Sequence, residues 1–202
     1  AEGIEAPLSG SAVILGNGKL YGGPFPVFRD ARNDDGLLDV LVMHRHGFAA
    51  TPAAPREPRS RPLRLTIATW NINSVRLRLP LLMQLIDQKK PDVFCLQETK
   101  TPDEFFPVAD IVAKGYKHYH FTGMKGYNGV CIFSKYPLGE VDIFKRCGKS
   151  DARHISAEVK APGRTFELHN IYIPAGGYEP DPIANDKFQH KLDFVDELAK
   201  WF

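Results

Sequence analysis

The sequence predicts an α/β fold for most of the chain, with helices layered on a mixed sheet and a small β-rich segment in front. In residues 63–202, helical patterns come early and late, and a run of strand patterns lies between them. A meander of strands flanked by helices argues against a doubly wound parallel sheet. The stretch 47–62 is rich in proline, alanine and arginine and has no hydrophobic period, so it predicts a linker after residues 1–46.

Three elements open residues 63–202. A β-rich run ends at Asn71, and a helical pattern then extends to Lys90, just before a proline. The run 91–99 is short and largely apolar, which predicts a strand buried on both faces. A second helical stretch, 105–115, ends at a glycine, as is typical of a helix C-cap. The apolar residues at helical spacing in the first helix are Leu81, Leu82, Leu85 and Ile86.

Strand patterns dominate the middle of the chain, at 116–121, 129–135, 139–146, 153–160 and 165–173. The last pattern, 187–202, predicts an amphipathic helix with one apolar stripe formed by Phe188, Leu192, Val195 and Leu198. Residues 1–46 favour two strands, within 11–23 and 30–44, with hairpin signals at 17–18 and 35–36. So small a segment cannot bury a core by itself and needs a partner.

Composition excludes several classes of protein. The chain has 202 residues, of which 43% are hydrophobic and 25% charged, and its formal net charge is +2. So mild a charge does not by itself indicate nucleic-acid binding. The three cysteines are widely spaced without a CxxC pair, so neither a disulfide framework nor a zinc ribbon is supported. No apolar run of membrane-spanning length and no signal sequence occurs, so we expect a cytoplasmic protein.

Polar side chains follow three of the apolar runs, where strands are expected to end. Asn71 ends the first run, Glu98 ends the second, and Tyr172 lies at the end of the last predicted strand. A rigid sheet presents reactive groups at such an edge. Carboxylate and amide oxygens suit a hard cation, so Asn71 and Glu98 are candidate ligands of Mg²⁺ (or Mn²⁺).

Basic and aromatic residues supply candidate contacts to a phosphate or a nucleotide. Lys100, Arg153 and Lys187 are candidate phosphate contacts, and Tyr127, in a glycine-rich loop, is a candidate to stack on a nucleotide. The pattern also leaves ordinary roles open. A glutamate at a strand end is often surface decoration, an asparagine there is often a turn residue, a tyrosine in a strand is usually core, and lysines at helical spacing often form a solvated face.

Six stretches, in order, resemble the N-terminal half of exonuclease III, in the exonuclease–endonuclease–phosphatase superfamily. They are IATWNINSVRLRLP, QKKPDVFCLQETKTPDEFFP, GYNGVCIFSK, GKSDARHISAEV, ELHNIYIPAGG and DPIANDKFQHKLDF. The resemblance implies a four-layer α/β sandwich of two packed sheets, incomplete in this chain. It also implies cleavage of DNA phosphodiesters, as 3′-to-5′ exonuclease action on duplex DNA and endonuclease action 5′ of abasic sites.

The resemblance implies roles for individual residues. Glu98 matches the family's metal-binding glutamate, and Asn71 matches the asparagine beside it. Tyr172 matches an active-site tyrosine that contacts the scissile phosphate, and Arg153 matches a basic residue near the bound phosphate or DNA. The implied mechanism is metal-assisted, in-line attack of water on phosphorus, with Mg²⁺ (or Mn²⁺) as cofactor and double-stranded DNA with abasic sites as partner.

Later parts of the family pattern do not occur in the sequence: an Asp-x-Asn pair, a further Asp and a C-terminal Asp-His. We therefore expect the 202-residue chain, taken by itself, to have negligible nuclease activity and to be poorly stable, because half of the sandwich is missing. The alternative function is that of a non-catalytic fusion remnant that binds DNA or a partner protein.

The first segment has a resemblance of its own. Residues 12–42, chiefly through GNGKLYGGPFP and DDGLLDV, resemble part of the C-terminal domain of the diacylglycerol and lipid kinase family. The resemblance implies that Asp35 is a ligand of a structural cation, and a plain turn at 34–36 is the alternative. The kinase's nucleotide-binding domain does not occur, so a lipid kinase fragment without activity is expected. Two partial families joined by a proline-rich stretch suggest a fusion by frameshift, assembly error or rearrangement.

Overall fold

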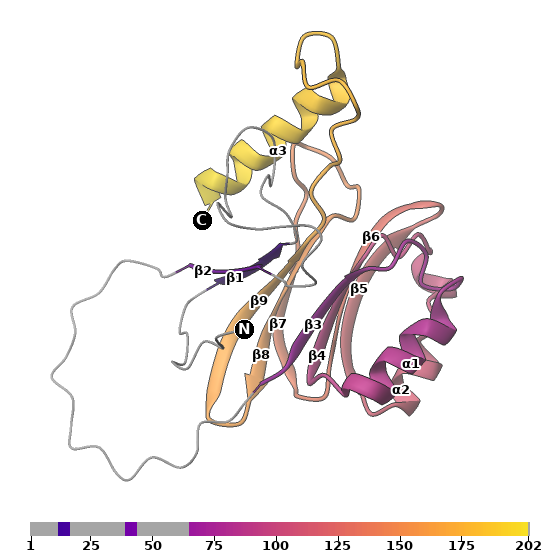
Figure 1. Ribbon diagram of the computed structural model, residues 1–202. Coiled ribbons are helices and arrows are strands. Elements are labelled where there is room, and N and C mark those ends of the chain that lie inside the picture. The colour runs from indigo at the N-terminus through magenta and orange to yellow at the C-terminus, as the bar shows by residue number, and fades with distance from the viewer. Residues whose placement is uncertain (1–11, 17–38, 44–64, 202) are drawn as a thin grey trace, which may run out of the picture.

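The computed structural model describes residues 12–16, 39–43 and 65–201. Strands β1 (Ala12–Gly16) and β2 (Asp39–Met43) pair antiparallel (Figure 1). They lie within the two runs predicted to form strands in the first segment. Asp35, the predicted turns at 17–18 and 35–36 and the linker 47–62 lie outside the described residues. The fold that bears on function is therefore that of residues 65–201.

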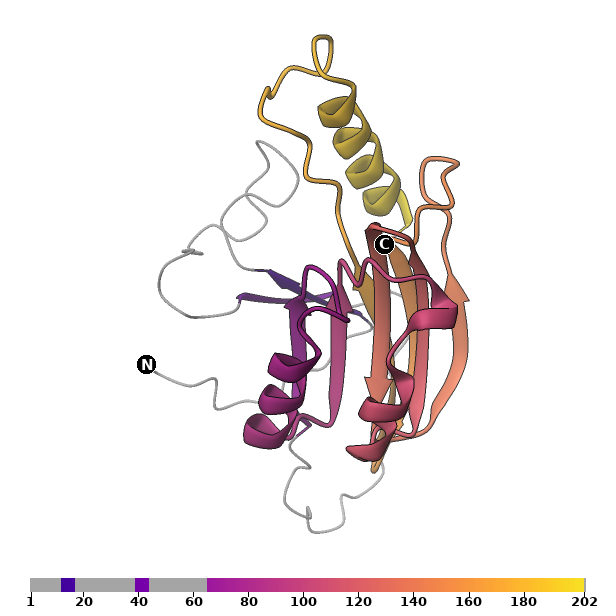
Figure 2. The same ribbon diagram turned by 90° about the vertical axis from the view of Figure 1, so that its right-hand side faces the viewer.

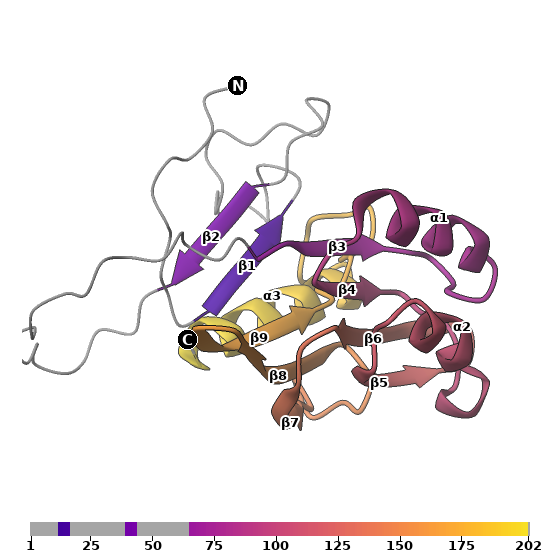
Figure 3. The same cartoon turned by 90° about the horizontal axis from the view of Figure 1, so that it is seen from below.

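The first sheet of this region has four strands in the order β3-β4-β6-β5 (Figure 3). The strands are β3 (Ile67–Asn71), β4 (Val93–Gln97), β5 (His118–Met124) and β6 (Tyr127–Ser134). β3 and β4 are parallel, whereas β6 runs antiparallel to both of its neighbours. The sheet is therefore mixed, which confirms the prediction.

Two helices cover one face of this sheet, and they face the viewer in Figure 2. α1 (Leu79–Lys89) is the crossover between the parallel strands β3 and β4, and α2 (Val108–Ala113) follows a short 3₁₀ turn, η1 (Asp103–Phe105). α1 ends where Lys90 adopts the left-handed conformation. Leu82 and Ile86 are buried against the sheet. Leu81 is 54% exposed and lies outside the buried stripe, contrary to the prediction.

The other face of the first sheet packs on a second sheet, in the order β7-β8-β9. Its strands are β7 (Leu138–Ile143), β8 (His154–Ala161) and β9 (Arg164–Ile171), all antiparallel. Strand β4 lies between the layer of helices and the second sheet. Its Phe94 and Leu96 contact the helix layer, and Val93 and Cys95 contact the second sheet. This alternation explains why β4 is apolar at successive positions and confirms that it is buried on both faces.

The last helix, α3 (Asp186–Trp201), stands beyond one end of the two sheets (Figure 2). Its most buried residues are Phe194 and Leu198, so the buried face is rotated from the predicted stripe, which omitted Phe194. The final turn docks through Glu197, whose carboxylate accepts a hydrogen bond from the backbone N–H of Cys147 at 2.6 Å. None of the helices in the described residues is both long enough and apolar enough to cross a lipid bilayer.

Buried polar groups join the second sheet to Arg146, which also donates from Nη1 to Glu197 Oε1 of α3 at 3.4 Å. The buried Arg146 donates from Nε to Nδ1 of His154 at 3.1 Å. A guanidinium only donates, so Nδ1 of His154 accepts, and its Nε2–H is left to donate to Nδ1 of His169 at 3.0 Å. Burial lowers the pKa of His154 to about 2, and the neighbouring His169 and Arg146 groups act in the same direction. Burial lowers the pKa of His169 as well. Both rings are therefore neutral in the folded chain near pH 7.

Candidate active site

Three strand ends meet at one edge of the molecule. β3 and β4 are parallel and pair Asn71 with Gln97, so their carboxyl ends coincide. The hydrogen bonds continue beyond the strands, because the N–H of Ile72 donates to the Gln97 carbonyl at 3.0 Å and that of Ser74 to the Glu98 carbonyl at 2.8 Å. Tyr172 follows the end of β9 in the second sheet. The expected edge thus draws on both sheets.

Backbone hydrogen bonds fasten the loops at this edge to one another. They join the segment after β4 to the start of β6, the start of β6 to the loop before β8, and that loop to the segment after β9, so the bonds run across the edge from one sheet to the other. The bonds run from Thr99 N–H to the Gly129 carbonyl (3.2 Å), from Lys100 N–H to Asn128 (2.9 Å), from Gly129 N–H to Ala152 (3.1 Å) and from Tyr172 N–H to Arg153 (2.7 Å). Side chains on these loops therefore have well-defined origins.

The Glu98 carboxylate is the centre of the site. Its Oε1 accepts hydrogen bonds from Asn71 Nδ2 at 2.7 Å and from Tyr172 Oη at 2.8 Å. Its Oε2 forms an ion pair with Lys100 Nζ at 2.9 Å. Asn71, Glu98 and Tyr172, singled out from three separate runs of the sequence, are in direct contact. The carboxylate side chain is 18% exposed, so it is reachable from solvent.

The surroundings of Glu98 keep it charged and keep Tyr172 protonated. Burial raises the pKa of the Glu98 carboxyl, but hydrogen bonds from Asn71, Lys100 and Tyr172 and the Lys100 charge outweigh burial and leave this pKa below its usual value. Burial, the hydrogen bond to Glu98 and the charge of Glu98 raise the pKa of Tyr172 to about 12. At neutral pH the pair is a carboxylate and a phenol that donates to it.

The loops of the site hold an unusual share of left-handed backbone. Six of the eight described non-glycine residues with positive φ lie in them: Asn73 (47°), Ser74 (88°), Glu98 (53°), Lys100 (50°), Asn128 (41°) and Ala152 (51°). Such conformations cost free energy and persist where the surrounding structure imposes them, which occurs most often at functional sites. Glu98 and Lys100 both adopt the left-handed conformation, and this sets the direction of the two side chains that form the ion pair.

Of the remaining predicted residues, some lie at the site and others do not. Arg153 lies against Tyr172, with its guanidinium carbon 4.8 Å from the ring centroid, and its Nε is paired with Asp151 at 2.5 Å. Tyr127 is the first residue of β6 and is 71% exposed. Lys187 lies on the exposed surface in the first turn of α3 and is not among the residues that bond to Glu98. Arg153 and Lys100 therefore belong to the site, and Lys187 does not contact it.

The sequence did not single out Asn170, whose side chain holds the strands next to Glu98 together. Its Nδ2 donates to the carbonyls of Leu96 and Cys131 at 2.9 and 2.8 Å, and its Oδ1 accepts from Gln97 Nε2 at 2.6 Å. It thus ties the second sheet to the first, next to Glu98. The signal that could have found it is its place in β9, where a polar residue occupies the same inward face as the apolar Leu168 and Phe166.

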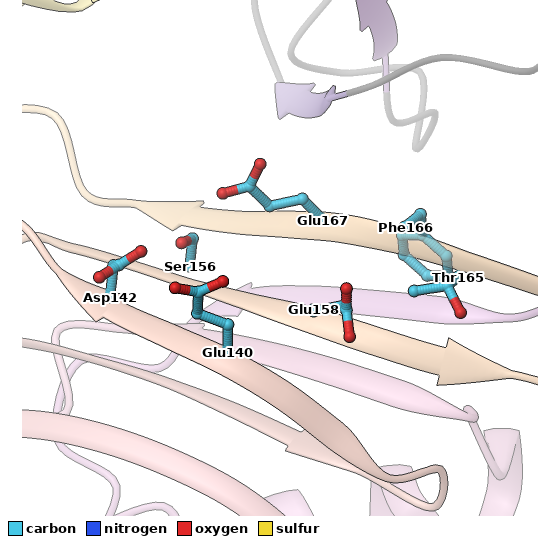
Figure 4. A pocket seen from close by; sticks show the side chains of 7 residues that line it. All are labelled: Glu140, Asp142, Ser156, Glu158, Thr165, Phe166 and Glu167. Atoms are coloured by element: carbon cyan, nitrogen blue, oxygen red, sulfur yellow. The ribbon is translucent and has the colours of Figure 1, made fainter.

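A hollow of about 280 Å³ lies elsewhere, along the strands of the second sheet (Figure 4). Four carboxylates line it, those of Glu140, Asp142, Glu158 and Glu167. Their charge repels phosphates, so this hollow is unsuited to nucleic acid. Within the part of the chain that the structure describes, no group of three or more histidine, cysteine, aspartate or glutamate residues is arranged to hold a metal ion. The edge around Glu98 is the better candidate.

The residues at this edge fit a hard divalent cation. Glu98 offers a carboxylate that stays ionised, and Asn71 offers an amide whose oxygen becomes available once the amide group turns over. The carboxylate already holds one cation, the Lys100 ammonium, in a direct ion pair. Mg²⁺ accepts one or two protein oxygens and keeps several waters, so a site with a single carboxylate is sufficient for it.

Residues 68–202 match the endonuclease/exonuclease/phosphatase family. The chain therefore belongs to this family, as the resemblance in the sequence predicted, and the predicted α/β fold is that of its AP endonuclease members.

Particular relatives have similar sequences and folds. Recombination repair protein 1 of Drosophila melanogaster is 32% identical over 121 residues, 59% of this chain and 18% of that protein. Exodeoxyribonuclease III of Haemophilus influenzae is 32% identical over 132 residues, 61% of this chain and 48% of that protein. An AP endonuclease from Archaeoglobus fulgidus superposes with a TM-score of 0.59 and 37% identity, over 67% of this chain and 49% of that one. The chain thus spans half or less of the length of these relatives.

Proposed function

We propose that the chain supplies one half of the active site of a Mg²⁺-dependent (or Mn²⁺-dependent) DNA phosphodiesterase of the exodeoxyribonuclease III and abasic-site endonuclease type, acting on double-stranded DNA in base-excision repair. One observation supports this more than any other. Asn71 at the end of β3, Lys100 beyond β4 and Tyr172 beyond β9 all bond to the Glu98 carboxylate at 2.7–2.9 Å. The names of the similar proteins, an exodeoxyribonuclease and an AP endonuclease, supply the substrate class.

Glu98 and Asn71 would hold the cation. When bound, the cation supplies charge that polarises a phosphoryl oxygen and lowers the pKa of a water. Tyr172 is a neutral phenol with a pKa of about 12, so it does not serve as a base. Its single O–H, which donates to Glu98 in the structure, would turn to a phosphate oxygen when the substrate binds. Arg153 packs on its ring at 4.8 Å and donates from Nη1 to its backbone carbonyl at 3.3 Å, so it orients Tyr172 while bringing positive charge near the phosphate.

DNA would lie across this edge. Lys100 supplies a mobile positive charge. The exposed ring of Tyr127, at the start of β6 next to Asn128, is available to pack against a sugar or a base. Contacts of this kind read the backbone and the shape of DNA and not its sequence. Recognition of an abasic site fits such a surface, because that site lacks a base and is easily deformed.

The three side chains bonded to Glu98 leave one task open. Hydrolysis needs a group that takes a proton from water, and the three side chains bonded to Glu98 are an amide, an ammonium and a phenol. None of them accepts a proton at neutral pH. We therefore expect the 202-residue chain, incubated by itself with Mg²⁺ and an abasic-site duplex, to show negligible nicking in a gel assay. Nicking by this chain would overturn the assignment of half a site.

Cation binding tests the proposal directly. We expect the 202-residue chain to bind Mn²⁺ at one site, measured by electron paramagnetic resonance of free Mn²⁺, and Glu98→Gln to abolish that binding because it removes the negative charge. Glu158→Gln, in the acidic hollow of Figure 4, is the matched control and should bind as the wild type does. Equal binding by the Glu98→Gln variant would reject the proposed cation site.

A further inference from the structure

Lys100 is paired with Oε2, the less occupied oxygen of the Glu98 carboxylate. Oε1 already accepts two hydrogen bonds, from Asn71 and Tyr172. A carboxylate oxygen has about two lone-pair positions, so the remaining capacity of Glu98 lies on Oε2. The Lys100 ammonium sits there at 2.9 Å. An incoming divalent cation therefore meets a cation that is already bound.

We propose that Lys100 and the divalent cation exclude each other on Glu98, so that Lys100 is free to reach the DNA phosphate only when the cation is bound. The inference rests on the proposed function and deepens it. An ammonium and a divalent ion on one carboxylate oxygen would lie within a few ångströms of each other, and their repulsion is strong at a partly buried site. Asn71 can stay beside the cation by turning its amide so that Oδ1 faces the ion, whereas Lys100 must leave, because an ammonium offers no lone pair and keeps its positive charge.

The Lys100 side chain is built to move while its backbone stays in place. Its N–H donates to the Asn128 carbonyl at 2.9 Å, and its carbonyl accepts from the Gly126 N–H at 3.4 Å. The side chain is 31% exposed and has a flexible four-carbon stem. Its ammonium has a second acceptor, Asn73 Oδ1 at 2.6 Å. On leaving Glu98 it therefore remains at the edge where the phosphate would lie.

This exchange couples cation binding to DNA binding. Without the cation, the positive charge of Lys100 is neutralised by Glu98, and the edge attracts phosphate weakly. With the cation, Glu98 is neutralised by another group and the ammonium becomes available to a phosphate oxygen. Each of the two ligands should then raise the affinity of the chain for the other by the same factor.

Mn²⁺ titration of variants of the 202-residue chain tests the exchange. We expect Lys100→Gln to bind Mn²⁺ roughly fivefold more tightly than the wild type, because the competing ion pair is lost. Lys100→Arg keeps a competing charge and should stay near the wild-type affinity. Lys114→Gln is the matched control, since Lys114 pairs with Asp87 at 2.7 Å and has a similar side-chain exposure, 34% against 31% for Lys100. It should leave Mn²⁺ affinity unchanged.

DNA binding provides a second readout, by fluorescence anisotropy of a duplex with an abasic-site analogue. Mn²⁺ should raise the DNA affinity of the wild type and of Lys114→Gln more than that of Lys100→Gln. Unchanged or weaker Mn²⁺ binding by Lys100→Gln, with binding by the wild type still dependent on Glu98, would refute the exchange alone. Absence of Glu98-dependent Mn²⁺ binding in the wild type would refute the proposed function together with the exchange.

Discussion

Next to the site, the side chain of Asn170 joins the second sheet to the first. Its three hydrogen bonds reach Gln97 and the carbonyls of Leu96 and Cys131, and its side chain is nearly fully buried. Buried polar groups must be paired, because an unpaired one keeps the full cost of leaving water. The apolar interface around Asn170 therefore tolerates this amide only in its present geometry.

Replacement of Asn170 should destabilise the chain strongly. We expect Asn170→Ala to lower the free energy of unfolding by about 3 kcal/mol, since three hydrogen bonds of about 1 kcal/mol each are lost. Urea denaturation followed by circular dichroism measures this. Gln189→Ala removes an exposed amide that donates to Asp193 on α3 and should change stability by less than about 0.5 kcal/mol. An equally small effect at Asn170 would contradict the role given to it.

At the scale of elements, β6 approaches the Glu98 loop closely because of a glycine. Gly129, near the start of β6, has φ +93°, and a Cβ atom there would overlap the Thr99 side-chain oxygen. Its backbone accepts the Thr99 N–H and donates to Ala152, so it joins three loops of the site. The left-handed conformation and the close approach both favour glycine.

Two glycine substitutions separate these two requirements. Gly126 also has positive φ, +76°, but open space surrounds the position of its Cβ. We expect Gly126→Ala to cost about 1 kcal/mol for the backbone alone. Gly129→Ala should cost more and should weaken Mn²⁺ binding, because Thr99 and with it Glu98 must shift. Thr99→Ala should rescue part of this loss in the double variant, measured by urea denaturation and Mn²⁺ titration. Equal effects of the two glycine variants would show that the close approach is unimportant.

At the scale of the whole molecule, the docking of α3 makes stability depend on pH. His154 and His169 are buried between the second sheet and Trp201 of α3, and burial lowers the pKa of both. The unfolded chain binds protons at these residues near pH 6.5, whereas the folded chain does not. Stability is therefore complete above pH 6.5 and falls as the pH drops below it, towards the folded pKa of His154 at about 2.

A pH series of urea denaturation checks this. His154 alone should lower the free energy of unfolding by about 2 kcal/mol between pH 6.5 and pH 5. The pKa values of His120 and His190 are also lowered by burial, so these residues add loss of the same sign. His154→Gln should be less stable at pH 7 but should lose less stability on acidification. A wild-type stability that stays constant from pH 7 to pH 5 would contradict the neutral histidine pair.

Local pattern was sufficient to predict the elements and the three strand ends. Strands and helices have different hydrophobic periods, and β4 is apolar at successive positions because both of its faces are covered, so its type could be inferred from residues 91–99 alone. The buried faces of α1 and α3 were less well predicted, since Leu81 and Phe194 fit an apolar stripe equally well on pattern. Which apolar residue is covered depends on the neighbouring layer, which a period does not describe.

By itself, the sequence determined the mixed α/β fold of residues 65–201, the position of polar residues at strand ends and the family to which the chain belongs. Only the tertiary structure decided that Tyr172 donates to Glu98 across 74 positions of sequence, that Asn170 ties the sheets together, and that Lys100 pairs with Glu98 whereas Lys187 is not bonded to it. The physical reason is that periodicity reports which face of an element is buried. Contacts between distant loops depend on the register and packing of whole sheets.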